Sequence, residues 1–316
     1  MERLTVLENR LAVAGPQGAR PVRLKGYNRS GFQHKPSLAL AGMPDPAAEL
    51  RAFATTWGAR IVRFPLALDL YLGDPAYRDD LDRVVTGAEA AGVYLMLEFH
   101  GVSDAPQPPL PPRSIIGAWG ALARAYGGRA HVVFDLFNEP HSVPWAPWKA
   151  LAEACVRAIR DAGALATLLV VGGLDWAYDL SPLRRPENRI ADGGPLAYAT
   201  HPYPFKGVPA HREAEWDRHF GDVSEEVPVL VAEFGANGSG IPPFGFGTNE
   251  EAVDWLGALL AYIDARGLSG MAWSVGDMPH LVDAAPGVPV VLPAAPPHPE
   301  EPTDPFGVMV RDWMRA

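Results

Sequence analysis

Residues 132–141 read VVFDLFNEPH, an apolar run of strand length that ends abruptly at Asn138, Glu139 and Pro140. Proline has no backbone N–H for a sheet, and it biases the residue before it towards extended geometry. The run therefore predicts a buried strand that delivers Glu139 at its carboxyl end, where a buried layer meets solvent. A carboxyl group in that position can have a raised pKa and act as a proton donor, but it needs a chemical partner.

The composition is that of a globular protein without a nucleic-acid or membrane footprint. The chain has 316 residues, 48% of them hydrophobic, and a net charge of −10, which argues against binding to nucleic acid or anionic membranes. Its first residues, MERLTVLENRLAVAG, contain no long apolar run. We therefore expect no signal peptide or membrane span, and either a cytoplasmic protein or a secreted one whose signal has been removed. We also expect a monomer.

Eight apolar, strand-like segments recur along the chain, usually separated by helical patterns. They are residues 21–26, 60–64, 93–99, 132–137, 168–171, 197–200, 229–232 and 270–274. Short apolar strands that alternate with helices indicate a parallel sheet covered by helices. Eight such units in about 300 residues favour a closed (β/α)8 TIM barrel over an open sheet, and no GxGxxG or GxxxxGK[ST] motif indicates a nucleotide site.

The predicted organisation is one catalytic domain spanning residues 1–316. Residues 1–20 contain a short hairpin, around residues 4–14, that we expect to close the bottom of the barrel. Helix starts are marked by Asp45-Pro46, Asp74-Pro75 and Asp304-Pro305, and Thr248 with Glu251 fits a capping box. The proline-rich stretches 105–113 and 288–302 are loops that serve either as rigid connections or as walls of a cleft.

Functional side chains are expected at the carboxyl ends of the barrel strands, where the site of such a barrel forms. Those ends carry Arg63, His100, Asn138, Glu139, His201, Tyr203, Glu233 and Trp273. Two glutamates on different strands suit glycosidic bond hydrolysis, because one can protonate the leaving oxygen while the other attacks the anomeric carbon or activates water. Each glutamate alone is as well explained as a solvated strand-end carboxylate. The whole set of strand-end residues, taken together, is not explained in that way.

This set resembles glycoside hydrolase family 5, the cellulase-type barrels of clan A, over nearly the whole chain. FNEP on the fourth strand with a glutamate on the seventh is specific to the clan. The added arginine, histidines, tyrosine and tryptophan are specific to the family. The resemblance implies a retaining enzyme with Glu139 as acid/base and Glu233 as nucleophile.

The resemblance also implies roles for the other residues of the set. Arg63 and Tyr203 would keep Glu233 ionised, and His201 would bond near Glu139. Asn138 would bind the sugar 2-hydroxyl, His100 would bind other hydroxyls, and Trp273 would stack beneath the ring. For a retaining enzyme we expect the two carboxyl groups about 5–5.5 Å apart rather than roughly 6.5–9.5 Å.

Further side chains are candidates for outer sugar sites. Trp176 and Tyr178 follow the fifth strand and could form an aromatic platform, which Trp145 and Trp148 could extend, although helix packing suits Trp148 better. Asn28, Phe32 and His34, after the first strand, are expected to line the opposite, non-reducing side. The glycine-rich loop 234–247 directly follows the nucleophile.

Strand alternation also bears on two carboxylates, Glu98 and Asp135, that the resemblance does not assign. If Arg63, His100 and Glu139 point inward, then Glu98 and Asp135 do so too, one step deeper. Buried carboxylates must be paired, hydrogen-bonded or protonated. We therefore hypothesise a polar layer below the site. The alternative, with one of the carboxyls turned outward to a helix, is left equally open.

The expected substrate is a β-linked oligo- or polysaccharide, with an endo-acting β-1,4-glucanase favoured over a β-mannanase or another β-glycan hydrolase. A non-catalytic carbohydrate-binding barrel is the alternative from another class, but it would be expected to lack one glutamate. No metal or other cofactor is expected. The first strand, PVRLKGYN, has no His-x-His, and four other histidines have no ligand spacing: His131, His141, His211 and His219. The single Cys155 excludes an intramolecular disulfide and a cysteine zinc site, and it is expected to be a packed thiol.

Overall fold

The computed structural model describes residues 1–103, 105–206, 212–236, 248–277, 281–282, 300, 302–303 and 305–316. Several predicted features fall wholly or partly outside these ranges. They are most of the loops 234–247 and 288–302, His211, and Asp304 at the start of the last helix. Within the described ranges, no helix combines the length and apolar character needed to cross a membrane.

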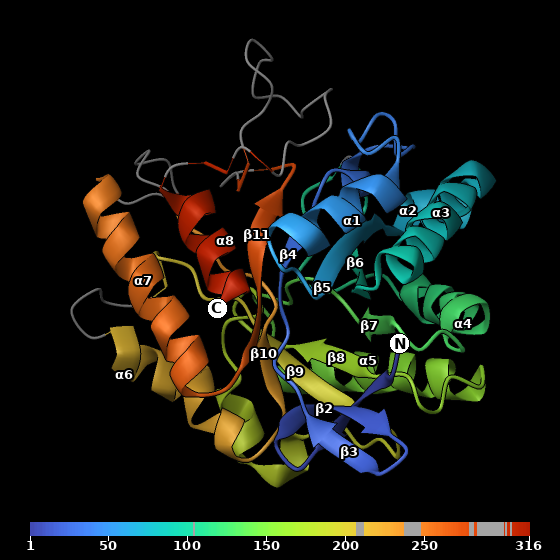
Figure 1. Ribbon diagram of the computed structural model, residues 1–316. Coiled ribbons are helices and arrows are strands. Elements are labelled where there is room, and N and C mark those ends of the chain that lie inside the picture. Colours follow the sequence, from blue (N-terminus) through green and yellow to red (C-terminus); the bar gives the residue numbers. More distant parts are fainter. Residues whose placement is uncertain are drawn as a thin grey trace.

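Eight parallel strands close into a barrel, as the alternating pattern predicts (Figure 1). In chain order they are β4 (Lys25–Arg29), β5 (Ile61–Ala67), β6 (Tyr94–Gly101), β7 (Val132–Asp135), β8 (Leu169–Gly172), β9 (Leu196–Thr200), β10 (Val229–Val231) and β11 (Ser269–Val275). Each strand pairs with its sequence neighbour, and β11 pairs with β4 to close the ring. The TIM-barrel prediction is therefore confirmed.

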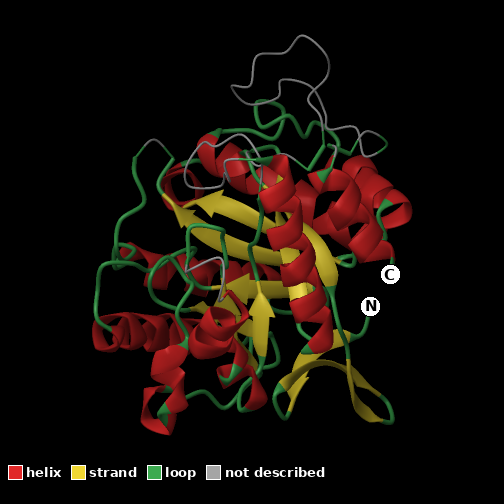
Figure 2. Ribbon diagram, turned by 90° about the vertical axis from the view of Figure 1, so that its left-hand side faces the viewer, coloured by secondary structure: helices red, strands yellow, loops and turns green. Residues whose placement is uncertain are grey.

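Helices cover the outside of the barrel (Figure 2). They are α1 (Pro46–Thr56), α2 (Leu68–Gly73), α3 (Pro75–Ala91), α4 (Ser114–Tyr126), α5 (Trp145–Asp161), α6 (Arg212–Trp216), α7 (Asn249–Ala265) and α8 (Phe306–Arg315). Three predicted N-caps are confirmed: Asp45 accepts from the Ala48 N–H, Asp74 from Ala76 and Thr248 from Glu251. Between β8 and β9 the chain forms 3-10 turns, Ser181–Arg184 and Pro186–Asn188, where prolines prevent a longer helix.

The N-terminal hairpin is present and is extended by a third strand. β1 (Arg3–Leu7), β2 (Arg10–Gly15) and β3 (Gly18–Pro21) form an antiparallel sheet below the barrel (Figure 1). Leu4, Leu11 and Val13 pack with barrel residues such as Ile61 and Leu230 in one apolar cluster. Because Pro21 belongs to this sheet, the first barrel strand begins at Lys25, later than the predicted range 21–26.

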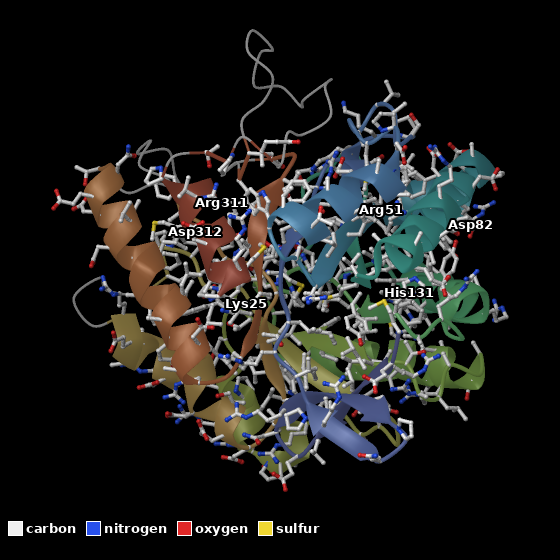
Figure 3. The ribbon with its side chains drawn as sticks, in the orientation of Figure 1. Lys25, Arg51, Asp82, His131, Arg311 and Asp312 are labelled. Carbon is white, nitrogen blue, oxygen red and sulfur yellow. The ribbon has the colours of Figure 1, made fainter. Side chains whose placement is uncertain are left out.

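A second, larger apolar cluster lies between the strands and the surrounding helices, and it includes Cys155, which is buried as expected. Lys25 of β4 anchors the last helix to this shell (Figure 3). Its ammonium group lies 3.1 Å from a carboxylate oxygen of Asp264, donates to the carbonyl of Trp313 at 3.0 Å and sits over the Trp313 ring.

Candidate active site

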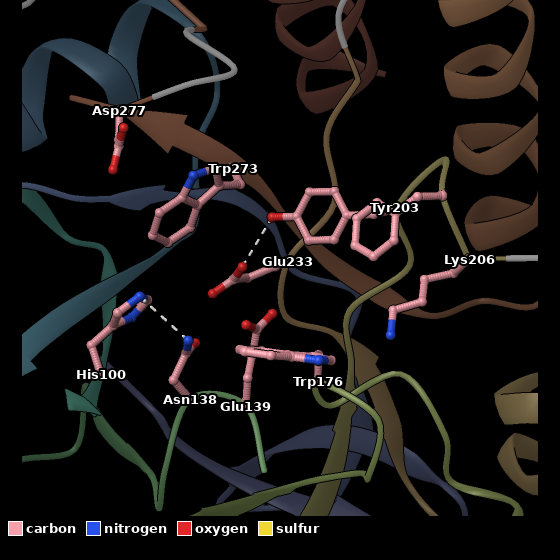
Figure 4. Close-up of a pocket in the computed structure, with 10 residues that line it drawn as sticks. His100, Asn138, Glu139, Trp176, Tyr203, Lys206, Glu233, Trp273 and Asp277 are labelled. Carbon is pink, nitrogen blue, oxygen red and sulfur yellow. Dashed lines mark hydrogen bonds between the residues drawn. The ribbon is translucent and has the colours of Figure 1, made fainter. Parts of the chain in front are cut away.

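A pocket of about 410 Å³ opens at the carboxyl end of the barrel (Figure 4). Its lining residues are His100, Asn138, Glu139, Trp176, Tyr203, Phe205, Lys206, Glu233, Trp273 and Asp277. The two glutamates lie in the middle of the close-up, with His100, Trp273 and Asp277 on one side, Tyr203 and Lys206 on the other, and the Trp176 ring next to Glu139 in this view. The strand ends thus bring together most of the predicted set.

Arg63 is the centre of a charged layer directly beneath the pocket. Its side chain is fully buried, and its guanidinium donates to Asp135 Oδ2 at 2.8 Å and to Glu233 Oε1 at 2.5 Å. Glu98, also fully buried, lies 3.5 Å from the same guanidinium. Both Glu98 and Asp135 therefore point inward, which confirms the hypothesised polar layer and rules out the outward alternative. The three carboxylates hold the pKa of Arg63 high despite its burial.

Glu233 is held by donors on both carboxylate oxygens. Arg63 donates to Oε1, and the Tyr203 hydroxyl donates to Oε2 at 3.0 Å. Burial raises the pKa of Glu233, while the charge of Arg63 and the Tyr203 hydrogen bond act in the opposite direction. A carboxylate supported in this way can remain ionised in a buried site and serve as a nucleophile.

Glu139 lies opposite, with much weaker support for a negative charge. His201 Nδ1 is 3.0 Å from its Oε1. The pKa of His201 is lowered, first by burial and then by Arg63, so the imidazole is neutral at pH 7. Burial and the charge of Glu233 raise the pKa of Glu139 well above the usual value for a glutamate. Of the two carboxyls, Glu139 is the one suited to carry a proton.

A chain of polar side chains fixes the residues around Glu139. Glu98 Oε1 lies 2.7 Å from His100 Nδ1, which leaves His100 Nε2 to meet the Asn138 amide at 3.3 Å. The Asn138 carbonyl oxygen accepts from Arg63 at 3.0 Å, and its amide donates to Gln107 Oε1 at 2.8 Å. Gln107 in turn donates to the Glu139 backbone carbonyl at 2.8 Å. Both Asn138 and the acid/base candidate are therefore held in place.

The two ends of the pocket are lined by flat rings. Trp273 lies parallel to His100, with ring centroids 5.5 Å apart and an interplanar angle of 20°. His34 borders an adjoining cavity of about 190 Å³ that also includes His100 and Gln107, so it lies on the side of the pocket where it was expected. At the other end, Trp176 is 39% exposed and faces the pocket.

Some of the predicted outer residues do not reach the pocket. Asn28 is fully buried in the barrel interior, where its amide donates to the Ala232 carbonyl at 2.9 Å and its oxygen accepts from Arg63 at 3.1 Å. The strand prediction ended at residue 26, but β4 continues to Arg29, so Asn28 lies within the strand rather than beyond it. It supports the charged layer.

The other corrections concern aromatic residues that belong to the core. Tyr178 is buried against His219 and Phe220, Phe32 stacks on Tyr77, and Trp145 donates to the Asn188 carbonyl. Trp148 is fully buried and donates to Gly172, which is the helix-packing role that suited it better. A loop aromatic has no periodicity from which its direction can be predicted, and packing a ring in the core is the stronger driving force.

Four residues of the site were not predicted: Gln107, Phe205, Lys206 and Asp277. Phe205 and Lys206 lie two and three residues after the predicted Tyr203, and the stretch 105–113 was a candidate cleft wall. A systematic search of residues just beyond the strand ends would have found Phe205 and Lys206, whereas Gln107 lies well beyond its strand end in a loop that carries no such signal. Asp277, three residues beyond Ser274, follows from the same rule.

Among the described residues, one group of three His, Cys, Asp or Glu side chains is close enough together to hold a metal ion. Glu139, His201 and Glu233 each offer one ligand atom, and these atoms all lie within 4.8 Å of one another. The Arg63 guanidinium, 2.5 Å from Glu233, already places a fixed positive charge against this set. A second cation would be repelled there.

Comparison with known proteins gives a consistent result. The chain is 26% identical over 231 residues to endoglucanase N of Pectobacterium atrosepticum, covering 70% of this chain and 47% of the relative. It is 25% identical over 229 residues to endoglucanase E-5 of Thermobifida fusca, covering 68% and 45%. This chain thus spans about half the length of the curated relatives that it matches.

Solved structures share the fold. The β-glucanase SdGluc5_26A from Saccharophagus degradans, solved in complex with cellotetraose, superposes with a TM-score of 0.82 at 21% identity, covering 100% of this chain and 93% of that one. The sequence model of the cellulase family, glycosyl hydrolase family 5, matches residues 17–279. The chain therefore belongs to the cellulase family, glycosyl hydrolase family 5.

Proposed function

We propose that this chain is a retaining, endo-acting β-glycoside hydrolase that cleaves β-1,4-glucan. The observation that carries the proposal is the pairing of Glu139 and Glu233. An oxygen of one carboxyl lies within 4.8 Å of an oxygen of the other. Retaining glycosidases hold their carboxyl groups about 5–5.5 Å apart, whereas inverting enzymes need roughly 6.5–9.5 Å to admit a water molecule between carboxyl and sugar. The short gap supports double displacement.

In the first step Glu233 attacks the anomeric carbon, and the bond from that carbon to the leaving oxygen breaks. Glu139 gives its proton to the leaving oxygen, so that the departing sugar leaves as a neutral alcohol. Arg63 and Tyr203 keep Glu233 ionised until it attacks. The products are a glycosyl ester on Glu233, a Glu139 carboxylate and a free sugar with a new hydroxyl at its non-reducing end.

In the second step water cleaves the ester. Once Glu233 is esterified it carries no charge, so one of the causes that raise the pKa of Glu139 is gone. Glu139 then accepts a proton from water, the oxygen of that water attacks the anomeric carbon, and the bond to Glu233 breaks. Two inversions give net retention, and both carboxyls return to their starting states.

The shape of the pocket supports action within a chain rather than at its end. Side chains line the pocket on both sides of the carboxyl pair, with His100, Trp273 and Asp277 on one side and Tyr203 and Lys206 on the other (Figure 4). A flat, hydroxyl-rich ring suits stacking on tryptophan. Glucan is favoured because the relatives are named endoglucanases, and four solved neighbours are complexes with cellotetraose.

The test is a screen of the wild-type protein on carboxymethylcellulose, lichenan, mannan, xylan and xyloglucan, with sizing of the products. We expect the highest activity on carboxymethylcellulose or lichenan, with a mixture of oligosaccharides from the start. Higher activity on mannan would overturn the proposed glucanase activity in favour of a mannanase. Release of a single small product would overturn the proposed endo action in favour of exo action.

The Glu233→Ala variant separates catalysis from binding. Loss of the nucleophile should lower kcat/KM on the preferred polymer by about 10⁴-fold or more. The variant should still bind the polymer in affinity electrophoresis. Equal activity of the wild type and this variant on every polymer would instead support a carbohydrate-binding barrel without catalysis.

A further inference from the structure

His141 directly follows the Asn138-Glu139-Pro140 motif and lies behind the Trp176 ring. The two rings are stacked, with centroids 3.6 Å apart and an interplanar angle of 5°. His141 is buried, whereas Trp176 is 39% exposed and lines the pocket. One face of the indole is thus covered by the imidazole, and the pocket contacts Trp176 from elsewhere. None of the roles described so far uses His141.

The imidazole is itself fixed by polar contacts. Nε2 lies 3.4 Å from the Gln107 carbonyl, Nδ1 lies 3.1 Å from the Ser142 hydroxyl, and the backbone N–H donates to the Pro109 carbonyl at 3.2 Å. A carbonyl can only accept, so Nε2 donates to the Gln107 carbonyl, and the Ser142 hydroxyl can pair with Nδ1 in either direction. The ring therefore has a defined orientation set by the stretch 105–113.

Trp176 stands in a backbone conformation that needs such support. Asp175, Trp176 and Ala177 have φ angles of 52°, 61° and 56°, three successive non-glycine residues in the left-handed region. Each of them is in a disfavoured conformation, and such conformations persist only where the surroundings impose them. The Trp176 N–H donates to the Pro140 carbonyl at 3.1 Å, and Lys206 Nζ donates to the Asp175 carbonyl at 2.8 Å.

We propose that His141 is a positioning residue for the leaving-group side of the site. It holds the Trp176 ring as a stacking surface for the departing sugar and ties that surface to the backbone segment that carries Glu139. This inference rests on the proposed function, in which Glu139 protonates the oxygen of that sugar. It explains why Trp176 is placed by the acid/base segment itself, through His141 and Pro140.

The test compares a substrate that places a sugar on the leaving-group side with one that does not. Cellopentaose places sugars on both sides of the scissile bond, whereas β-cellobiosyl fluoride has no sugar on the leaving-group side. We expect His141→Ala to lower the ratio of kcat/KM for cellopentaose to kcat/KM for the fluoride by about tenfold, the scale of one aromatic pair. Trp176→Ala should lower the ratio similarly, and the double variant should add little.

Matched variants separate positioning from a merely structural role. His141→Phe keeps a flat ring behind Trp176 and should restore the ratio to within about twofold of wild type. His131, another buried histidine whose Nε2 contacts a carbonyl, directly precedes β7 and so lies at the amino end of the barrel, opposite the pocket. His131→Ala controls for the loss of a buried imidazole and should leave the ratio unchanged.

The outcomes are distinguishable. If the wild type cleaves both substrates but His141→Ala leaves the ratio unchanged, or lowers both values equally, the positioning role is wrong while the proposed function stands. If the wild type cleaves neither substrate, both are overturned. Should His141→Ala fail to fold, His141→Leu, which keeps bulk without a flat ring, gives the same comparison.

Discussion

At its amino end the barrel interior is filled by apolar side chains, whereas at its carboxyl end, on the same strands, it is filled by charge. Ile61 packs with Leu230 in the apolar cluster beneath, and Arg63 lies two residues further along β5. The same step leads from Met96 to Glu98 and from Val133 to Asp135. Alternation of side chains keeps each pair on one face of its strand.

This difference separates the two tasks of the interior. The amino end gains stability from burying apolar surface against the N-terminal sheet, at roughly 25 cal/mol per Å². The carboxyl end buries Glu98, Asp135 and Glu233 around one arginine and places Glu139 at the pocket beside them. This arrangement stabilises little and shifts pKa values strongly. We therefore expect substitutions at the amino end to change stability alone, and substitutions at the carboxyl end to change activity, with or without a loss of stability.

The largest expected difference is between Glu139→Gln and Leu230→Ala. Glutamine cannot donate the proton, so kcat on cellopentaose should fall about 10²–10⁴-fold, and the fall in activity at high pH that reflects loss of this proton should disappear. The melting temperature should not fall. Leu230→Ala should instead cost about 2–5 kcal/mol of unfolding free energy and leave kcat per folded molecule unchanged. A melting temperature that falls equally in both variants would contradict this division.

Arg63→Leu and Ile61→Val test the division within a single strand. Loss of Arg63 leaves buried carboxylates without their cation, and we expect a loss of about 3–5 kcal/mol in stability. Activity should fall by about 10²–10³-fold, because Glu233 loses its charged donor. Ile61→Val should cost only about 0.5–1.5 kcal/mol, with unchanged activity. Urea unfolding and kcat/KM on cellopentaose measure both, and similar stability losses for the two variants would argue against a charged layer that depends on Arg63.

A smaller effect is expected in the pH dependence of stability. Burial raises the pKa of Asp135 to about 7, with Arg63 acting in the opposite direction. Between about pH 4 and pH 7 the unfolded chain loses this proton while the folded protein keeps it, so rising pH favours unfolding. Asp135→Asn has no such proton to lose.

The stability of the Asp135→Asn variant relative to wild type should therefore increase with pH across this window, by on the order of 1–2 kcal/mol. Urea unfolding of both proteins at several pH values between 4 and 8 measures this change. A constant difference between the two proteins would show that Asp135 is ionised throughout.

The sequence predicts the barrel and its charged end because both depend on alternation along strands. Arg63, His100 and Glu233 follow from strand ends, and Glu98 and Asp135 follow from the parity of residues within the strands. The same rule misplaces Asn28, because the predicted strand ended too early and alternation does not reveal how deep a residue lies. An error in the predicted end of a strand therefore leads to an error in how deep in the barrel a residue is placed.

Loops carry no comparable rule. Trp176 and Tyr178 are two residues apart and would share a face in an extended strand, but the left-handed run at 175–177 turns Trp176 to the pocket and Tyr178 into the core. Gln107 reaches Asn138 and Glu139 from a proline-rich stretch without periodicity. Contacts of this kind depend on where the folded loop lies in space, and nothing in the local sequence encodes them.

The most direct test of the account is the anomeric configuration of the first product. In a proton NMR time course of cellopentaose hydrolysis, the close pairing of Glu139 and Glu233 predicts that the β-anomer of the new reducing end appears first and then mutarotates. Initial appearance of the α-anomer would mean single displacement by water, and would contradict the assignment of Glu233 as the nucleophile.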